Sequence, residues 1–201
     1  MSTTVNKPLY ITDPDRAREI RERDFFDTRN IRDQYKGLGN EEILAQLPTT
    51  ELVAILSNNI RDFNWGTVIR NANAFAVKEV VFTLSKKYDR RATVGAHHYQ
   101  KISYIPDPHD AIDHYRDLGY RIVAAEYDEN YDMHWINDYQ WEEKTALIFG
   151  EEGMTIPHDI LTRVDDIVAI PMYGTVRSIN VGTASGIFFS HYASQHVPKS
   201  S

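Results

Sequence analysis

The chain has 201 residues, no cysteine and a formal net charge of −7 at pH 7. The absence of cysteine excludes disulfides and thiolate metal sites, and 42% hydrophobic with 25% charged residues is ordinary for a globular domain. No apolar run is long enough to span a membrane and the N-terminus lacks the apolar core of a signal peptide, so we expect a cytoplasmic protein. The negative charge argues weakly against nucleic acid as a partner, although a local basic face would be sufficient to bind it.

The sequence pattern of residues 1–50 differs from that of the rest of the chain and predicts a short helical N-terminal extension. Oppositely charged side chains are dense over 14–34, which predicts a solvated, salt-bridged helix that breaks near Asp27. Asn40 is expected to cap a second, short helix over 41–47.

From residue 51 onward, short apolar runs alternate with amphipathic stretches, which predicts one domain over 51–201. Buried strands are predicted at 52–56, 79–84, 102–105, 120–125, 145–149 and 167–170. Helices are predicted to begin at Asn64, to cover 108–118 and 158–163, and to follow Asn180, whereas 88–99 and 130–141 are expected to be mainly irregular. This alternation predicts the α/β class, with a mostly parallel sheet covered by helices on both faces.

Ligands of such sheets lie beyond the carboxyl ends of the strands, and the first polar stretch after a strand is 58–70. It contains Asn64 and, six residues later, Arg70. An arginine in an otherwise apolar helix needs a partner, because a buried unpaired charge is costly. We therefore expect either an anion contact or an internal salt bridge to Glu79 or Glu152.

Two further stretches follow later strands. In 149–153, two glycines bracket two carboxylates, which suits either close approach of a ligand or an ordinary acidic turn. In 170–181, Ser178 and Asn180 are good helix-start residues. The small residues over 182–186 that follow them permit either a flat ligand or a tightly packed neighbouring helix, and the sequence leaves both open.

Several common sites have no support in the sequence. There is no GxGxxG motif after a strand and no GxxxxGK[ST] motif, so dinucleotide and P-loop sites are disfavoured. There is also no HExxH motif. His97 and His98 are adjacent, are expected to point in different directions and lack an obvious third ligand, so we predict no catalytic metal.

In this order and at these spacings, the three stretches resemble the three signature motifs of the SpoU branch of the SPOUT RNA methyltransferases. The matching segments are Asn64-Trp-Gly-Thr-Val-Ile-Arg70, Ala146-Leu-Ile-Phe-Gly-Glu-Glu-Gly153 and Ile170-Pro-Met-Tyr-Gly-Thr-Val-Arg-Ser-Ile-Asn-Val181. The resemblance covers about 51–192. Ala76 and Thr155 each stand where the family usually has glycine.

The resemblance implies methyl transfer from S-adenosyl-L-methionine to a ribose 2′-hydroxyl of RNA. It also implies a trefoil knot in the C-terminal segment and a homodimer with the site at its interface. Periodicity cannot reveal a knot, because true knots are rare in proteins.

The resemblance also assigns roles to single residues. Arg70 is the central residue, either as acceptor of the hydroxyl proton or as a charged clamp on phosphate and alkoxide, and both roles stay open because a charged guanidinium has no acceptor. Asn64 is expected to orient Arg70 or the ribose, and Glu152 to hold Arg70 or its loop. Ser178 and Asn180 are expected to fix the third loop and to contact the ribose or phosphate.

The adenosine is expected in a slot with apolar walls and backbone hydrogen bonds. Its predicted residues are Phe149, Gly150, Ile170, Met172 and Ile179.

The predicted RNA contacts are basic residues outside this slot. They are Arg61, Lys86, Lys87, Arg90, Arg91 and Arg177. For 86–91, a solvated basic loop is an equal alternative. The resemblance implies tRNA or rRNA as the substrate. We expect tRNA rather than rRNA because the N-terminal extension is short, which is an argument by analogy.

Two other functions are compatible with the fold class. One is a SPOUT-like module that binds RNA or cofactor without turnover, against which the retained motif residues argue. The other is an unrelated α/β enzyme with a small-molecule substrate.

Overall fold

The computed structural model describes residues 29–58, 63–150 and 155–198. Contacts within the chain divide it into two compact units, Met1–Ala45 and Gln46–Ser201. The predicted boundary lies a few residues later, at 50/51. Thr50 belongs with the second unit, since its backbone N–H and its hydroxyl both donate to the carbonyl of Ala76, at 2.8 and 2.9 Å.

The described part of the first unit contains the 3-10 helix η1 (Asp33–Tyr35) and helix α2 (Asn40–Leu44). Predictions for residues 1–28 lie outside the described residues. The expected continuation of a helix over 29–34 is wrong, because the backbone of 29–32 is not helical and the 3-10 helix begins only at Asp33. The Arg29 guanidinium donates to Leu38 O at 2.9 Å. Asn40 is the first residue of α2 rather than its cap. Gly39 takes the cap position, and its N–H donates to Glu42 Oε2 at 2.7 Å.

The second unit is built on a seven-stranded sheet in the order β3-β2-β1-β6-β4-β7-β5. Every strand pairing in it is parallel, which confirms the predicted class. The strands are β1 (Val53–Asn58), β2 (Glu79–Leu84), β3 (Ile102–Tyr104), β4 (Arg121–Ala125), β5 (His134–Trp135), β6 (Thr145–Phe149) and β7 (Asp166–Ala169). In register, Val53 lies opposite Glu79 of β2 and Ala146 of β6.

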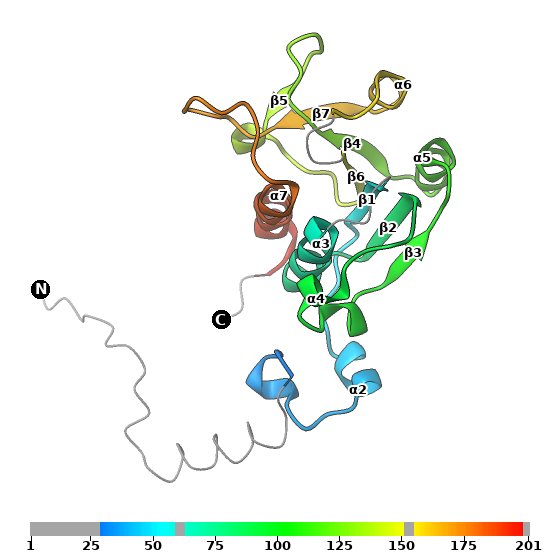
Figure 1. The fold of residues 1–201 in the computed structure, drawn as a ribbon, viewed down its shortest axis with the longest axis vertical. Coiled ribbons are helices and arrows are strands. Elements are labelled where there is room, and N and C mark those ends of the chain that lie inside the picture. The colour runs from blue at the N-terminus through cyan, green and yellow to red at the C-terminus, as the bar shows by residue number, and fades with distance from the viewer. Residues whose placement is uncertain (1–28, 59–62, 151–154, 199–201) are drawn as a thin grey trace, which may run out of the picture. The chain divides into compact units, whose positions relative to one another are not determined.

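Successive side chains of the central strands enter two separate cores, because neighbouring residues of a strand point to opposite faces. Ala54 and Leu56 pack in the first core with α3 (Phe63–Ala74) and α7 (Val181–His196). Val53 and Ile55 pack in the second with α5 (Pro108–Asp117) and α6 (His158–Leu161). Figure 1 shows α3 and α7 on one side of the sheet and α5 and α6 on the other. Burial on both faces explains why these strands read as uninterrupted apolar runs.

Four short elements fall inside the two segments expected to be mainly irregular. Segment 88–99 contains α4 (Arg90–Thr93) and η2 (Ala96–His98), and segment 130–141 contains β5 and η3 (Ile136–Asp138). Strand β5 has only two residues, both exposed, and lies at the sheet edge beside β7. Such short elements carry too little periodicity to be recognised. None of the described helices combines the length and apolar character needed to cross a membrane.

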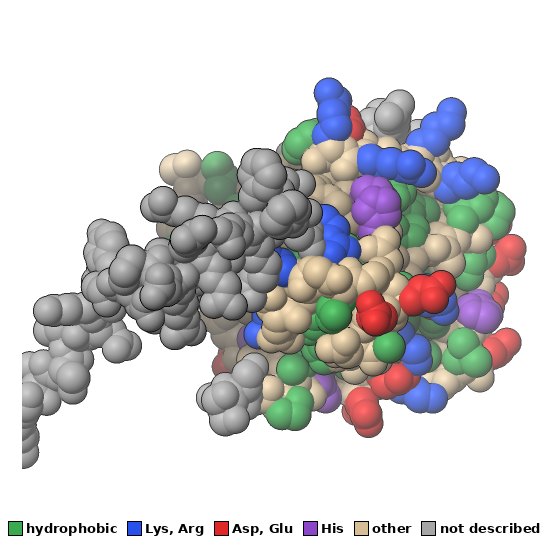
Figure 2. All heavy atoms as spheres, turned by 90° about the horizontal axis from the view of Figure 1, so that it is seen from below, with side chains coloured by type: hydrophobic (Ala, Val, Ile, Leu, Met, Phe, Trp, Pro, Cys, Tyr) green, Lys and Arg blue, Asp and Glu red, His purple; other side chains and the backbone are tan. Residues whose placement is uncertain are grey.

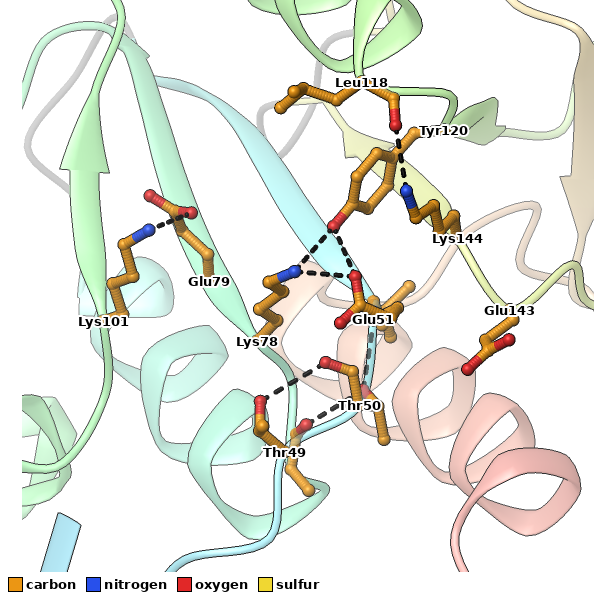
Figure 3. Close-up of polar contacts among 12 residues, drawn as sticks. Thr49, Thr50, Glu51, Lys78, Glu79, Lys101, Leu118, Tyr120, Glu143 and Lys144 are labelled. Carbon is orange, nitrogen blue, oxygen red and sulfur yellow. Dashed lines mark hydrogen bonds and ion pairs between the residues drawn. The ribbon is translucent and has the colours of Figure 1, made fainter. Parts of the chain in front are cut away.

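The amino ends of the strands are joined by a polar network (Figure 3). Glu51, just before β1, accepts hydrogen bonds from Lys78 Nζ at 2.6 Å and from the Tyr120 hydroxyl at 3.1 Å. The Lys78 ammonium holds the pKa of Glu51 below its usual value, and Glu51 in turn raises the pKa of Lys78. Lys144, before β6, donates to Leu118 O at 3.1 Å. These contacts connect the starts of β1, β2, β4 and β6.

Gly66 lets α3 lie directly against α4. A Cβ at this position would be 2.5 Å from Ala92 Cβ and 2.6 Å from the Asp89 carbonyl oxygen. Because one of these atoms is backbone, the clash cannot be relieved by rotating a side chain. The glycine of the first motif is therefore required for packing.

We predict that Gly66→Ala destabilises the protein by about 2 kcal/mol, the usual cost of overpacking. A loss of stability would be informative, because replacing glycine by alanine inside a helix normally stabilises a protein by about 1 kcal/mol. Gly174→Ala is the matched control, since a Cβ there meets nothing within 4 Å. Urea unfolding of the three proteins measures both changes, and equal stability of the two variants would contradict the packing argument.

Candidate functional site

A cavity of about 870 Å³ opens at the carboxyl ends of β4, β6 and β7, beside the start of α7. Most of its lining comes from the residues after β4, the end of β6 and the loop that leads from β7 into α7. Trp135 of β5, Thr155 and the first turns of α7 complete it. This is the edge at which parallel sheets bind ligands.

All five residues predicted for the adenosine slot line this one cavity: Phe149, Gly150, Ile170, Met172 and Ile179. Buried apolar residues provide much of the wall, and glycine provides backbone without a side chain. A pocket of this volume that combines apolar side chains with polar groups suits a nucleoside-sized ligand. The structure thus brings the predicted residues together, and their role in binding stays a prediction.

The loop between β7 and α7 forms one side of the cavity. Arg177, Ser178 and Asn180, all assigned from the third motif, line it. Tyr173 in the same loop is 89% exposed. The loop therefore presents polar side chains to the cavity and an aromatic ring to solvent.

Asn180 joins the third motif to the first. Its Oδ1 accepts from the backbone N–H of Gly182 at 2.9 Å and of Thr183 at 3.3 Å, so it caps α7 as expected. Its Nδ2 donates to Asn64 Oδ1 at 2.9 Å. One side chain therefore holds both the start of α7 and the start of α3.

Tight packing on α3 explains the two glycines of α7. A Cβ at Gly182 would lie 2.9 Å from Thr67 Cγ2, and a Cβ at Gly186 would lie 3.3 Å from Asn71 Nδ2. Asn71 Nδ2 also donates to Gly182 O at 2.7 Å and to Ser185 Oγ at 3.0 Å. Of the two readings left open for 182–186, helix packing is correct for the glycines, whereas Ala184 lines the cavity.

The side chain of Arg70 is not buried, although its apolar neighbours in the sequence suggested that it would be. Its side chain is on the exposed side of α3 and is not part of the cavity lining. The suggested salt bridge to Glu79 is wrong, because Glu79 pairs with Lys101 Nζ at 2.8 Å. Glu152 lies outside the described residues. Within the described residues, Arg70 forms no ion pair and its side chain is available to a ligand.

The predicted RNA-binding cluster lies around α4, away from the cavity lining. Lys86, Lys87, Arg90 and Arg91 are all exposed, and Arg61 lies outside the described residues. Arg91 pairs with Asp89 at 2.6 Å.

His97 and His98 lie beside this cluster. The expectation that they point in different directions is wrong, since their ring centroids are 4.0 Å apart. Burial lowers the pKa of His97, with smaller contributions from the neighbouring charges of His98 and Arg90. The parts of the chain described contain no group of three His, Cys, Asp or Glu residues arranged to hold a metal.

Sequence reasoning missed the wall that follows β4. Glu126, Tyr127 and Trp135 line the cavity, and the two aromatic rings stack at 6.0 Å between centroids. Burial raises the pKa of Glu126, whose carboxylate accepts from the backbone N–H of Ile156 at 2.8 Å. The signal was available, because Glu126 directly follows a predicted strand.

Residues 51–190 match the model of the SpoU rRNA Methylase family. The chain belongs to this family. The match covers all three motifs, every described residue that lines the cavity, and α7 as far as residue 190.

Curated relatives of the SpoU chain act on two kinds of RNA. A tRNA (guanosine(18)-2′-O)-methyltransferase from Thermus thermophilus is 26% identical over 150 residues, which cover 73% of this chain and 76% of the relative. The 23S rRNA (guanosine-2′-O-)-methyltransferase RlmB from Neisseria meningitidis is 28% identical over 166 residues, which cover 79% of this chain and 64% of the relative.

Solved structures share the SpoU fold. The Aquifex aeolicus TrmH/SpoU tRNA modifying enzyme matches with a TM-score of 0.69 at 22% identity, over 78% of this chain and 83% of that one. The SpoU methyltransferase AviRb from Streptomyces viridochromogenes, in complex with AdoMet, matches with a TM-score of 0.62 at 22% identity, over 76% and 61% of the two chains.

We predict that Asn180→Ala and Asn180→Asp separate the cap of α7 from the hydrogen bond that Asn180 donates to Asn64. The alanine variant loses the cap of α7, at a cost of about 1 kcal/mol. The aspartate variant keeps oxygen acceptors for the Gly182 and Thr183 amides, and its charge is favourable at a helix start. It should therefore stay within about 0.5 kcal/mol of the natural chain in urea unfolding, although it no longer donates to Asn64.

Asn64→Ala in each background completes the test. The additional loss should be smaller in the Asn180→Ala background than in the natural chain, as expected for directly bonded side chains. If Asn180→Asp were as unstable as Asn180→Ala, the stability would come from the bond to Asn64 and not from the cap.

Proposed function

We propose that this chain transfers a methyl group from S-adenosyl-L-methionine to a ribose 2′-hydroxyl of RNA. The main support is the single cavity lined by the second and third motifs and connected to the first motif through the hydrogen bond between Asn64 and Asn180. Family membership and the 2′-O-methyltransferase names of the relatives support the same activity.

The cofactor would be held by the residues that fit a nucleoside. Phe149, Ile170 and Ile179 offer apolar contacts in the cavity, and Gly150 leaves its backbone accessible. When bound, S-adenosyl-L-methionine supplies a methyl group activated by its sulfonium charge. The chain's part is to align this group with the sugar oxygen and to exclude water.

Arg70 is the proposed catalytic residue on the RNA side. Its exposed guanidinium, without an ion pair to the described residues, is available for the target nucleotide. As a clamp it donates hydrogen bonds to phosphate and to the developing alkoxide, and the proton leaves to phosphate or water. As an acceptor it takes the proton itself, which requires loss of its charge. Ser178 and Asn180 orient the ribose in either case, and Glu152 is proposed to support Arg70.

A homodimer would bring Arg70 and the cavity into one site. Arg70 shares the exposed side of α3 with Phe63, which is 55% exposed, and Ile187 on the adjoining α7 is 38% exposed. We propose that this surface packs against a second copy, so that the site lies at the interface. The trefoil knot, the helical extension over 1–50 and the cytoplasmic location stay predictions from the sequence.

The proposed RNA surface is the basic cluster around α4, together with Arg61. Arg177 is predicted as an RNA contact outside the adenosine slot, but it lines the same cavity as the slot residues. Figure 2 shows Lys and Arg side chains gathered around a histidine along the upper edge of the face it presents. A local basic face compensates for the acidic net charge. We propose tRNA ahead of rRNA. The tRNA-modifying relative from T. thermophilus is matched over a larger share of its length than RlmB.

We predict that Arg70→Ala lowers methyl transfer at least about 100-fold, while folding and cofactor binding stay unchanged, because the charge acts on the RNA side. Labelled methyl donor with bulk tRNA measures the rate, and mass spectrometry of the nucleosides identifies the 2′-O-methylated product. Calorimetry with S-adenosyl-L-methionine measures binding. Arg116→Ala, which removes another partly exposed arginine, is the control.

Transfer at the natural rate by Arg70→Ala would remove Arg70 from the mechanism. Cofactor binding by the natural chain without transfer to either tRNA or rRNA would instead indicate a binding module.

Neighbouring arginines of α4 offer a matched test of RNA binding. Among the described residues the side chain of Arg90 has no ion pair, whereas the charge of Arg91 is offset by Asp89. We predict that Arg90→Gln weakens tRNA binding and lowers the slope of log affinity against log salt by roughly 1, as for one phosphate contact. Arg91→Gln should have a smaller effect. Equal effects, or none, in filter binding at several salt concentrations would assign the RNA surface elsewhere.

A further inference from the structure

Glu126 is a half-buried carboxylate fixed on the wall of the cavity. It follows β4 directly, and both of its oxygens are held by backbone amides: Oε1 accepts from Tyr127 N–H at 3.0 Å and Oε2 from Ile156 N–H at 2.8 Å. Ile156 is itself 2% exposed. The orientation of the carboxylate is therefore set by two separate segments of the chain.

No cation neutralises Glu126 within the described residues. It forms no ion pair there, and burial raises its pKa, with the nearby charge of Asp128 adding to the effect. A carboxylate that is partly removed from water and lacks a counter-charge favours a cationic ligand.

The described lining of the cavity is acidic as a whole. It includes the carboxylates of Glu126, Asp128 and Glu129, and Arg177 is the only lysine or arginine among the described lining residues. Glu129 accepts from the Tyr127 hydroxyl at 2.7 Å, and Asp128 accepts from Asn130 within the same turn. Glu126 alone of the three is held from two sides by backbone amides.

We propose that Glu126 supplies the negative charge by which the cavity prefers the cationic methyl donor over its neutral product. The proposal rests on the proposed function. The donor and S-adenosylhomocysteine share the adenosine, the ammonium and the carboxylate groups. They differ in one methyl group and in the positive charge on sulfur, and both are lost on transfer.

This assignment gives Glu126 a part in turnover. Once transfer has removed the sulfonium charge, the Glu126 carboxylate would no longer attract the sulfur. The product is then held less tightly than the donor, which favours exchange of one for the other. Glu126 is thus a specificity-determining residue and need not touch the RNA.

The test is the ratio of two dissociation constants, measured by calorimetry without RNA. In the natural chain S-adenosyl-L-methionine should bind more tightly than S-adenosylhomocysteine. Glu126→Gln keeps an oxygen acceptor for the Ile156 amide but removes the charge. It should weaken donor binding about tenfold and change product binding by no more than about twofold, as expected for loss of one partner of a partly buried charge pair.

Two controls make the assignment specific. Glu129→Gln removes a charge from the same wall and should change the ratio much less. Glu126→Asp keeps the charge and should keep the preference. Glu126→Ala, which removes the charge with the side chain, provides the test should Glu126→Gln fail to fold.

Each other outcome overturns the inference. Equal weakening of both ligands would mean that Glu126 contacts a shared part of them or only holds the Ile156 segment. An unchanged ratio, or an equal change in Glu129→Gln, would also remove the assignment. Failure of the natural chain to bind either ligand would refute the proposed function itself, which distinguishes the two failures.

Discussion

The close approach of α7 to α3 is the constraint on which the site depends. The two helices belong to motifs far apart in the sequence, and the hydrogen bond between Asn64 and Asn180 spans 116 positions. Gly182 and Gly186 permit the approach, and Asn71 on α3 donates hydrogen bonds to Gly182 O and Ser185 Oγ on α7. A Cβ at Gly182 would lie 3.1 Å from Thr67 Cβ, which side-chain rotation cannot move, whereas a Cβ at Gly186 would require only a small shift of the Asn71 side chain. Helix propensity is reduced at these glycines, and the packing they allow offsets that loss.

The groups that stabilise the sheet and the groups that are available to a ligand lie in different parts of the fold. At the amino ends of the strands, Glu51, Lys78 and Tyr120 satisfy one another, and the effects of Glu51 and Lys78 on each other's pKa show that the network favours their charged forms. At the carboxyl ends, Glu126 has no ionic partner among the described residues, and neither has Arg70 on the exposed side of α3. Charged groups without an ionic partner are typical of binding and catalytic sites, where the missing counter-charge is that of a ligand.

The sequence was sufficient for the parallel sheet and for the cavity wall formed by the second and third motifs. Runs such as 145–149 must be strands buried on both faces, and Asn180 caps its helix as its side-chain chemistry requires. The orientation of Arg70 was not predictable, because periodicity around it only described the apolar side of α3. The left-handed Ala76, with φ of 58°, explains why the family motif usually has glycine there. Glu126 was missed because the segment after β4 has no periodic pattern, although its position at a strand end was visible.

The charge distribution resolves an apparent conflict between an acidic protein and a polyanionic substrate. The described lining of the cavity is acidic, which opposes phosphate but suits a sulfonium. The basic cluster around α4 contributes nothing to that lining. A chain with a net charge of −7 can therefore serve both ligands if each meets a local field of the right sign, since electrostatic interactions between exposed groups fade beyond about 10 Å at moderate salt. Under the proposed function the RNA would be attracted by one surface and the cofactor selected by another, and Arg70 would be the cation that reaches from the RNA side towards the cavity. This would require either movement of Arg70 or a second copy of the chain, and the exposed faces of α3 and α7 are the surface that we propose for that second copy.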